Sequence, residues 1–197
     1  MKKLILNIIF FIDQTLFRWL VKLFYPAYKR PRTGYSEHYK VFFRYFFMQK
    51  IVGFNRMVPW PVDCRSKILA WRKIKKGIMC DPGDNPGLYI NAGGGLIIGD
   101  NVNIGPNSII VTANHNKYDH RKRGPNEGVE IGNNVWIGAN CVILAGTKVG
   151  DEVTIGAGCV ISGEIPSKHT VYLDKSNLIM KPKSLDYQWD IYSEKLT

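Results

Sequence analysis

Apolar side chains recur at every sixth position through the second half of the chain. The repeated positions are Ile98, Ile104, Ile110, Ile131, Ile137, Ile143, Val149, Ile155 and Ile161. A glycine usually follows the aliphatic residue, and a small or β-branched residue stands four positions after it. A period of six fits neither an amphipathic helix nor simple strand alternation, but it fits a short strand followed by a turn. Three such units predict a triangular coil of 18 residues, with glycine or asparagine tolerating the unusual backbone angles at the corners.

Residues 18 positions apart should stack on one another in such a solenoid. The sequence agrees, because Ile131 is followed by Val149, Ile137 by Ile155, and Ile143 by Ile161 at that spacing. Cys141 and Cys159 are also 18 apart, which predicts two buried thiols on adjacent coils, with a disulfide or a metal site as the alternative. We therefore expect a mainly β protein, a parallel β-helix of about five coils between residues 62 and 166.

One interruption of the repeat carries candidate chemistry. Ile110 and Ile131 are 21 residues apart, so 15 residues are left over after one six-residue unit. They fall within Thr112–Gly128, which is polar and contains His115 and His120. Long insertions in a compact fold are usually functional, so we expect a loop that leaves the solenoid and carries the site.

The first 60 residues follow another pattern. Leu4–Tyr25 predicts an apolar helix with one polar stripe, and a second helix is expected from Ser36 to about Val52. The second helix has aromatic residues nearly all round, which predicts extensive burial. We divide the chain into a helical segment (1–60), the β-helix (61–166) and a tail or cap (167–197).

Charge separates the same regions. The 197 residues carry a net charge of +11, yet residues 1–76 hold 17 basic and 3 acidic side chains and the remainder is slightly acidic. This excludes a uniformly basic nucleic-acid-binding protein, and the aromatic residues are spaced as in a helix core, so no nucleic acid partner is expected. The first helix, with its basic stripe and its Phe, Trp and Leu face, fits peripheral contact with an anionic membrane. The alternative is a helix packed within the protein's own assembly.

The compartment follows from the cysteines and the first residues. The four cysteines form no dense framework, which favours a reducing cytoplasm. No small-residue cleavage site follows the first apolar stretch, and that stretch is too short to span a bilayer. We expect a cytoplasmic protein at the inner face of the membrane.

Residues 89–166 resemble the hexapeptide-repeat acyltransferases, in particular galactoside, maltose and xenobiotic O-acetyltransferases and polysaccharide O-acetyltransferases. The resemblance lies in IIGDNVNIGPN (97–107), TANH (112–115), VEIGNNVWIGANCVILAGTKVGDEVTIGAG (129–158) and EIP (164–166). It implies a left-handed β-helix, a homotrimer with sites between subunits, acetyl-CoA as co-substrate and no metal. The implied reaction is O-acetylation of a sugar in a surface polysaccharide or its precursor.

The resemblance also assigns roles to individual residues. His115 matches the catalytic base, a role for which a neutral imidazole suits. The residues that match contacts to the cofactor are Ala139, Ala157, Ser162 and, for the CoA phosphates, Lys168, with Lys175, Lys181 and Lys183 as further candidates. Trp136 matches a tryptophan beside the active site, and Asn91 matches an acceptor-binding asparagine. The chain departs from the family at Gly163, where many relatives have a lysine, and it lacks their closing A-G-x-P-A-K pattern.

Three other functions are considered. A γ-class carbonic anhydrase would need a third histidine about two coils before His115 and His120, where the sequence offers Cys80 but no histidine. An N-acetyltransferase acting on an amino-sugar nucleotide is the nearest alternative reaction. A catalytically inert membrane scaffold is the alternative from another class.

Overall fold

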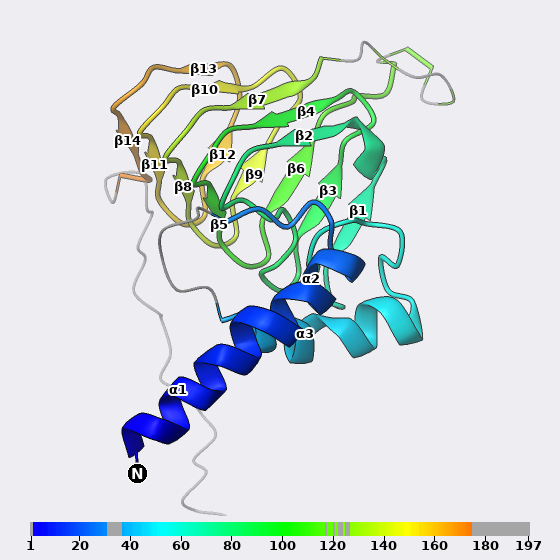
Figure 1. Cartoon of the computed structure of the whole chain (residues 1–197). Helices are drawn as coiled ribbons and strands as arrows, with labels where there is room; N and C mark the ends of the chain where they lie inside the picture. The colour runs from blue at the N-terminus through cyan, green and yellow to red at the C-terminus, as the bar shows by residue number, and fades with distance from the viewer. Residues whose placement is uncertain are drawn as a thin grey trace, which may run out of the picture.

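The computed structural model describes residues 2–30, 37–116, 118–119, 121, 124 and 127–174 (Figure 1). A long helical rod consists of α1 (Lys2–Ile12), the π-helical segment η1 (Asp13–Phe17) and α2 (Arg18–Phe24). A second rod consists of α3 (His38–Phe46) and the π-helical segment η2 (Phe47–Val52). The remaining described chain forms a left-handed parallel β-helix, so the predicted fold class is confirmed.

Three parallel sheets form the faces of the solenoid. Sheet A contains β1 (Lys67–Leu69), β3 (Tyr89–Asn91), β6 (Ile109–Val111), β9 (Val142–Ile143) and β12 (Val160–Ile161). Sheet B contains β2 (Ile74–Lys76), β4 (Leu96–Ile98), β7 (Val129–Ile131), β10 (Lys148–Val149) and β13 (Glu164–Ile165). Sheet C contains β5 (Asn103–Ile104), β8 (Trp136–Ile137), β11 (Thr154–Ile155) and β14 (Thr170–Val171), and a short 3₁₀ turn, η3 (Trp71–Lys73), joins β1 to β2.

The register of the strands confirms the 18-residue coil. Ile131 pairs with Val149, Ile137 with Ile155, and Ile143 with Ile161. The aliphatic residues at the sixfold positions are all buried, from 0% exposed at Ile110, Ile137 and Ile143 to 6% at Ile161. They form one continuous core along the solenoid axis, which also contains Cys141 and Cys159 as free thiols.

The glycine after each aliphatic residue has a different role from the one expected. Positive φ angles occur two residues later instead, as at Asn101, Asn134 and Asn140, each with φ between 54° and 57°. A Cβ atom on Gly138 would lie 2.5 Å from the backbone nitrogen of Ala157 on the next coil. Glycine is therefore required at these positions by the close approach of neighbouring coils, and asparagine supplies the left-handed corner.

The two helical rods pack against each other through aromatic side chains beneath the first coil (Figure 1). Phe24 and Phe42 both pack against Phe46, with ring centroids 4.7 and 4.4 Å apart. The expected extensive burial of the second helix is wrong, because Phe43 and Phe47 are 70% and 61% exposed. Phe43 contacts Phe17 of the first rod, with ring centroids 5.4 Å apart, but most of its surface and of the Phe47 surface is open to solvent. None of the helices in the described part of the chain combines the length and the apolar character that crossing a membrane requires.

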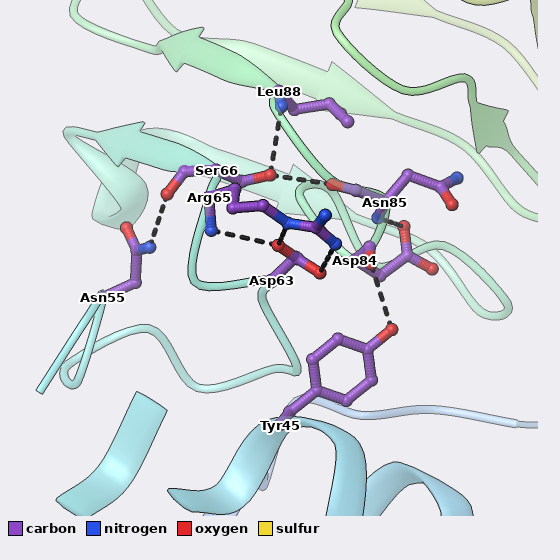
Figure 2. Close-up of polar contacts among 8 residues, drawn as sticks. All are labelled: Tyr45, Asn55, Asp63, Arg65, Ser66, Asp84, Asn85 and Leu88. Carbon is purple, nitrogen blue, oxygen red and sulfur yellow. Dashed lines mark hydrogen bonds and ion pairs between the residues drawn. The ribbon is translucent and has the colours of Figure 1, made fainter. Parts of the chain in front are cut away.

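Two side-chain amides close the first coil of the solenoid. Asn55 donates from Nδ2 to the Ser66 carbonyl at 2.8 Å and accepts the Ile68 N–H at 3.1 Å (Figure 2 shows the contact with Ser66). The buried Gln49 likewise donates to the Trp60 carbonyl at 3.0 Å and accepts the Val62 N–H at 3.0 Å. Each amide satisfies backbone groups that have no preceding coil to pair with.

Charged residues attach the helical segment to the turn between β2 and β3. Asp81 is buried between Arg30 at 2.7 Å and Lys76 at 3.1 Å. The Tyr45 hydroxyl donates to the backbone carbonyl of Asp84 at 3.0 Å (Figure 2). Burial and the nearby Asp81 raise the pKa of Asp84 to about 6. These contacts fix the helices against the solenoid at its first coil.

Candidate functional site

The predicted loop leaves the solenoid at the corner between sheets A and B. The chain departs after Val111 at the end of β6 and returns at Val129 at the start of β7. The Gly124 N–H donates to the Asn114 carbonyl at 2.8 Å and closes the base of the loop. A Cβ atom on Gly124 would lie 2.7 Å from the His115 carbonyl oxygen, so the backbone at His115 is held closely. His115 therefore stands, exposed, beside the closed base of the loop.

Asn91 lies on the preceding coil at the same corner. Its carbonyl accepts hydrogen bonds from the Thr112 N–H and hydroxyl, both at 3.0 Å. Its side-chain oxygen accepts the Gly93 N–H at 3.1 Å, so this asparagine shapes the turn that follows it. Sequence reasoning did not single out Thr112, which is fully buried and also accepts the Gly94 N–H at 2.8 Å. Thr112 ties the start of the loop to the coil of Asn91, and a threonine within TANH was the available signal.

The other sequence-predicted residues lie at different corners. Ser162 is exposed at the A/B corner, on the coil of β12. Ala139 and Ala157 follow β8 and β11 at the corner between sheets C and A, where the Gly158 N–H donates to the Ala139 carbonyl at 2.9 Å. Lys168 is exposed at the corner between sheets B and C. Lys175, Lys181, Lys183 and His120 lie outside the described residues.

Trp136 lies on the outer surface of sheet C and is 60% exposed. Sheet C is the face opposite the A/B corner, which carries His115. A face of about six residues at about 3.3 Å each is up to about 20 Å wide, beyond the reach of a side chain. Within one chain the fold therefore groups His115, Asn91 and Ser162 at one corner and leaves Trp136, Ala139 and Ala157 on another side.

The described residues contain no group of three His, Cys, Asp or Glu side chains placed to hold a metal ion. Cys141 donates a weak hydrogen bond from Sγ to the Gly156 carbonyl at 3.2 Å, and burial raises the pKa of the Cys80 thiol to about 12. These thiols are core residues. A shallow hollow on sheet B is lined by Glu130, Lys148, Glu164, Pro166 and Ser167, and it contains none of the predicted site residues.

Two family models match the solenoid. Residues 128–163 match the bacterial transferase hexapeptide (six repeats), and residues 95–112 match the hexapeptide repeat of succinyl-transferase. These two parts of the solenoid therefore contain hexapeptide repeats like those of the two models. The match at 95–112 ends where the His115 loop begins, and the match at 128–163 starts where the loop ends. The loop is therefore an insertion between hexapeptide repeats.

Several solved acetyltransferase structures are similar to this chain. Galactoside acetyltransferase in complex with coenzyme A is 22% identical, with a TM-score of 0.52 over 80% of this chain and 76% of that chain, which supports the fold. A hexapeptide-repeat acetyltransferase, VCA0836 of Vibrio cholerae, complexed with acetyl coenzyme A, is 26% identical with a TM-score of 0.44. That match covers 55% of this chain and 63% of the Vibrio protein. Maltose O-acetyltransferase of Clostridium difficile is 22% identical over 81% of each chain, with a TM-score of 0.41. No curated protein sequence gives a significant match.

Proposed function

We propose that the protein is an acetyl-CoA-dependent O-acetyltransferase that modifies a sugar hydroxyl of a surface polysaccharide or its precursor. The observation that carries the proposal is the position of His115, exposed beside the closed base of a loop that interrupts a β-helix of hexapeptide repeats. Coenzyme A and acetyl coenzyme A in the related acetyltransferase structures support the same co-substrate here.

In the proposed reaction, neutral His115 takes the proton of the acceptor hydroxyl as its oxygen attacks the thioester carbonyl. The carbon–sulfur bond then breaks, and the CoA thiolate leaves and takes up the proton from the imidazolium. The thioester is already activated, so no covalent enzyme intermediate is needed. General-base assistance of this kind contributes about 10²–10⁴-fold to the rate.

Small side chains and exposed cations support the cofactor assignment. Ala139 and Ala157 leave backbone accessible at the C/A corner, where a pantetheine arm can lie along the coils. Lys168 is exposed one corner further and offers a charge for the CoA phosphates. Ser162 is exposed at the A/B corner, close to the coils that carry the loop.

We further propose a homotrimer in which neighbouring subunits complete each site. The distribution of the residues supports this, because His115 and Trp136 lie on opposite sides of one solenoid. In a trimer the A/B corner of one subunit can face sheet C of the next. The acceptor would then bind between Asn91 and His115 of one chain and Trp136 of its neighbour.

The principal test measures acetyl transfer to each of a panel of saccharides by monitoring the release of the CoA thiol. His115→Ala should lower turnover at least about 10²-fold without changing the oligomeric state. His169→Ala is the matched control, since His169 is also exposed but lies at the B/C corner, with Nδ1 2.9 Å from the Ser167 carbonyl. Activity of His115→Ala close to the wild-type value would remove His115 as the base.

Complementation tests the shared site. Co-expression of His115→Ala and Trp136→Ala chains should restore activity in mixed trimers, because some interfaces then combine two intact partners. No restoration would show that Trp136 of a neighbouring subunit does not complete the His115 site. The acetylated atom separates the alternatives: an acetylated amine indicates the N-acetyltransferase, and no product with any acceptor indicates the inert scaffold.

The proposed location is cytoplasmic, with peripheral contact at the inner face of an anionic membrane. The excess of basic residues in the first 76 positions supports this location.

A further inference from the structure

The first helical rod presents a continuous apolar stripe to solvent. Ile5, Ile8, Ile12, Leu16, Trp19 and Leu23 follow one another at intervals of three or four residues, which places them on one side of the rod. All six are exposed, from 41% at Ile12 to 60% at Trp19. Figure 1 shows α1 extending away from the solenoid and past the end of α3.

A second stripe on the other rod continues the first. Phe43, Phe47 and Ile51 are spaced by four residues on α3 and η2, and they are 55–70% exposed. The two stripes meet at a small hollow to which Ile12 of the first stripe and Phe43 of the second both contribute. We call these nine residues the apolar surface.

A buried polar contact between the two rods keeps the apolar stripe of the first rod facing solvent. Asp13, 1% exposed, accepts the Tyr39 N–H at 2.7 Å and lies 3.2 Å from Nδ1 of His38. This contact fixes the rotation of the first rod against α3, so the stripe cannot turn toward the protein. The residues of α1 before Asp13 pack mainly against η1, the next part of the same rod.

Cations flank the apolar surface. Residues 1–60 contain 11 Lys and Arg but two acidic residues, Asp13 and Glu37. Asp13 is buried, and Glu37 is paired with Lys40. Arg18 and Lys22 are exposed on α2, and Arg44 is exposed on α3. The helical segment therefore presents apolar side chains and positive charge together, the combination that binds anionic lipid headgroups.

The pattern of α1 distinguishes a bilayer from a second protein chain. Leu6, Phe10 and Phe11, outside the stripe, are also 50–67% exposed, so exposed apolar side chains cover most of the circumference of α1 apart from its polar stripe at Asn7. A partner helix would cover only one stripe of α1, and a second copy of this basic segment would add charge repulsion. Anionic lipid can surround α1 and attracts its basic neighbours. The 11 residues of α1 reach about 16 Å, half of the roughly 30 Å hydrocarbon layer.

We propose that the apolar surface docks the protein on an anionic bilayer, with α1 embedded in one leaflet and Trp19 at headgroup level. Tryptophan is enriched at that level in membrane proteins. In Figure 1 the loop that follows β6 leaves the solenoid on the side away from the helices. Docking therefore leaves the His115 corner uncovered by the bilayer and open to solvent. The inference deepens the peripheral location proposed above and rests on that location, not on acetyl transfer.

The test is co-sedimentation of the full chain with extruded vesicles. Phosphatidylcholine vesicles are compared with vesicles containing about 30% phosphatidylglycerol, at low and at high salt. Wild-type protein should bind the anionic vesicles more tightly, and salt should weaken the binding. Arg18→Gln with Lys22→Gln should reduce the preference for the anionic vesicles.

An apolar residue of similar exposure on the solenoid provides a matched control for Trp19. Trp19→Glu should lower the partition coefficient at least about tenfold, since a carboxylate is expensive in the bilayer. Val160→Glu, on sheet A and 64% exposed, should bind within about twofold of wild type. Circular dichroism and size-exclusion chromatography establish that both variants keep their fold and assembly.

Two results would overturn the inference. The first is wild-type protein that shows no preference for anionic vesicles over phosphatidylcholine vesicles. The other is a Trp19→Glu variant that binds vesicles normally but dissociates to a smaller species, which would show that a second copy covers the apolar surface. Acetyl transfer to a soluble saccharide is measured separately. Absent vesicle binding with measurable turnover refutes only the membrane role. Vesicle binding without turnover refutes only the proposed reaction.

Discussion

Gly138→Ala tests whether the solenoid needs glycine because its coils approach so closely. The new Cβ would lie 2.5 Å from the backbone nitrogen of Ala157 and 2.9 Å from its Cα, where ordinary contacts are 3.4–4 Å. The coils would have to separate locally by about 1 Å, since backbone atoms cannot rotate away. The same movement stretches the hydrogen bond from the Gly138 N–H to the Ile155 carbonyl, now 2.7 Å.

The expected loss combines two effects. Overpacking of a dense interior costs about 1–3 kcal/mol, and weakening one buried hydrogen bond costs about 1 kcal/mol. We therefore expect the free energy of unfolding to fall by about 3 kcal/mol. For a chain of this size, that lowers the melting temperature by about 6–12 °C. Chemical denaturation at one fixed protein concentration measures the change, because assembly makes stability depend on concentration.

Two other glycines serve as controls. A Cβ on Gly163 meets nothing within 4 Å, but its φ of 78° strains an alanine, so Gly163→Ala should cost about 1 kcal/mol. A Cβ on Gly156 would lie 3.2 Å from Cβ of Tyr172 and 3.3 Å from the Val171 carbonyl oxygen, a much looser fit than the 2.5 Å contact at Gly138. Gly156→Ala should therefore cost about 1 kcal/mol or less. If Gly138→Ala loses no more than these two variants, close approach is not the reason for glycine at this position.

Three further predictions concern the core and the first coil. Asp84→Asn should stabilise the protein by about 1 kcal/mol at pH 7. The pKa of Asp84, about 6, lies above the ordinary 3.8, so the stability of the wild-type protein falls as the pH rises from about 4 to 6. Denaturation at pH 4, 5 and 7 should show a smaller change of stability with pH in the variant. Ile143→Ala, at a fully buried position, should cost about 2–5 kcal/mol, whereas Val142→Ala on the same strand, half-buried on the outer surface, should cost less than half as much by thermal unfolding. Tyr45→Phe removes the hydroxyl that donates to the Asp84 carbonyl and should cost about 1 kcal/mol in the same measurement.

The repeat made the β-helix predictable from the sequence. The sixfold spacing of aliphatic residues is a direct consequence of coil geometry, so the pairs Ile137–Ile155 and Ile143–Ile161 could be named in advance. The role of the glycines could not be, because a sequence does not distinguish a positive φ from a lack of space. Gly138 and Asn140 stand two residues apart, and their separate roles emerge from the distance to the next coil and from the φ of 57° at Asn140.

The helical segment was less predictable for a physical reason. An aromatic residue on a helix signals apolar contact but does not identify the partner, so Phe43 and Phe47 were expected inside the protein and lie outside. The buried contact of Asp13 with Tyr39 is long-range and left no local signal. For the candidate site, the sequence indicated the His115 loop, while the placement of Trp136 on the opposite side of the solenoid follows from the order of the three faces.

The amides of Asn55 and Gln49 have a consequence for assembly. A parallel ladder can in principle grow without limit, because each coil presents the same row of donors and acceptors to the next. Here each of the two side chains offers one donor and one acceptor to the first coil, as a peptide group of a further strand would. The first coil is thereby closed to a second solenoid stacking end to end. The carboxamides of Asn55 and Gln49 occupy hydrogen-bonding positions that an end-to-end stacked solenoid would need.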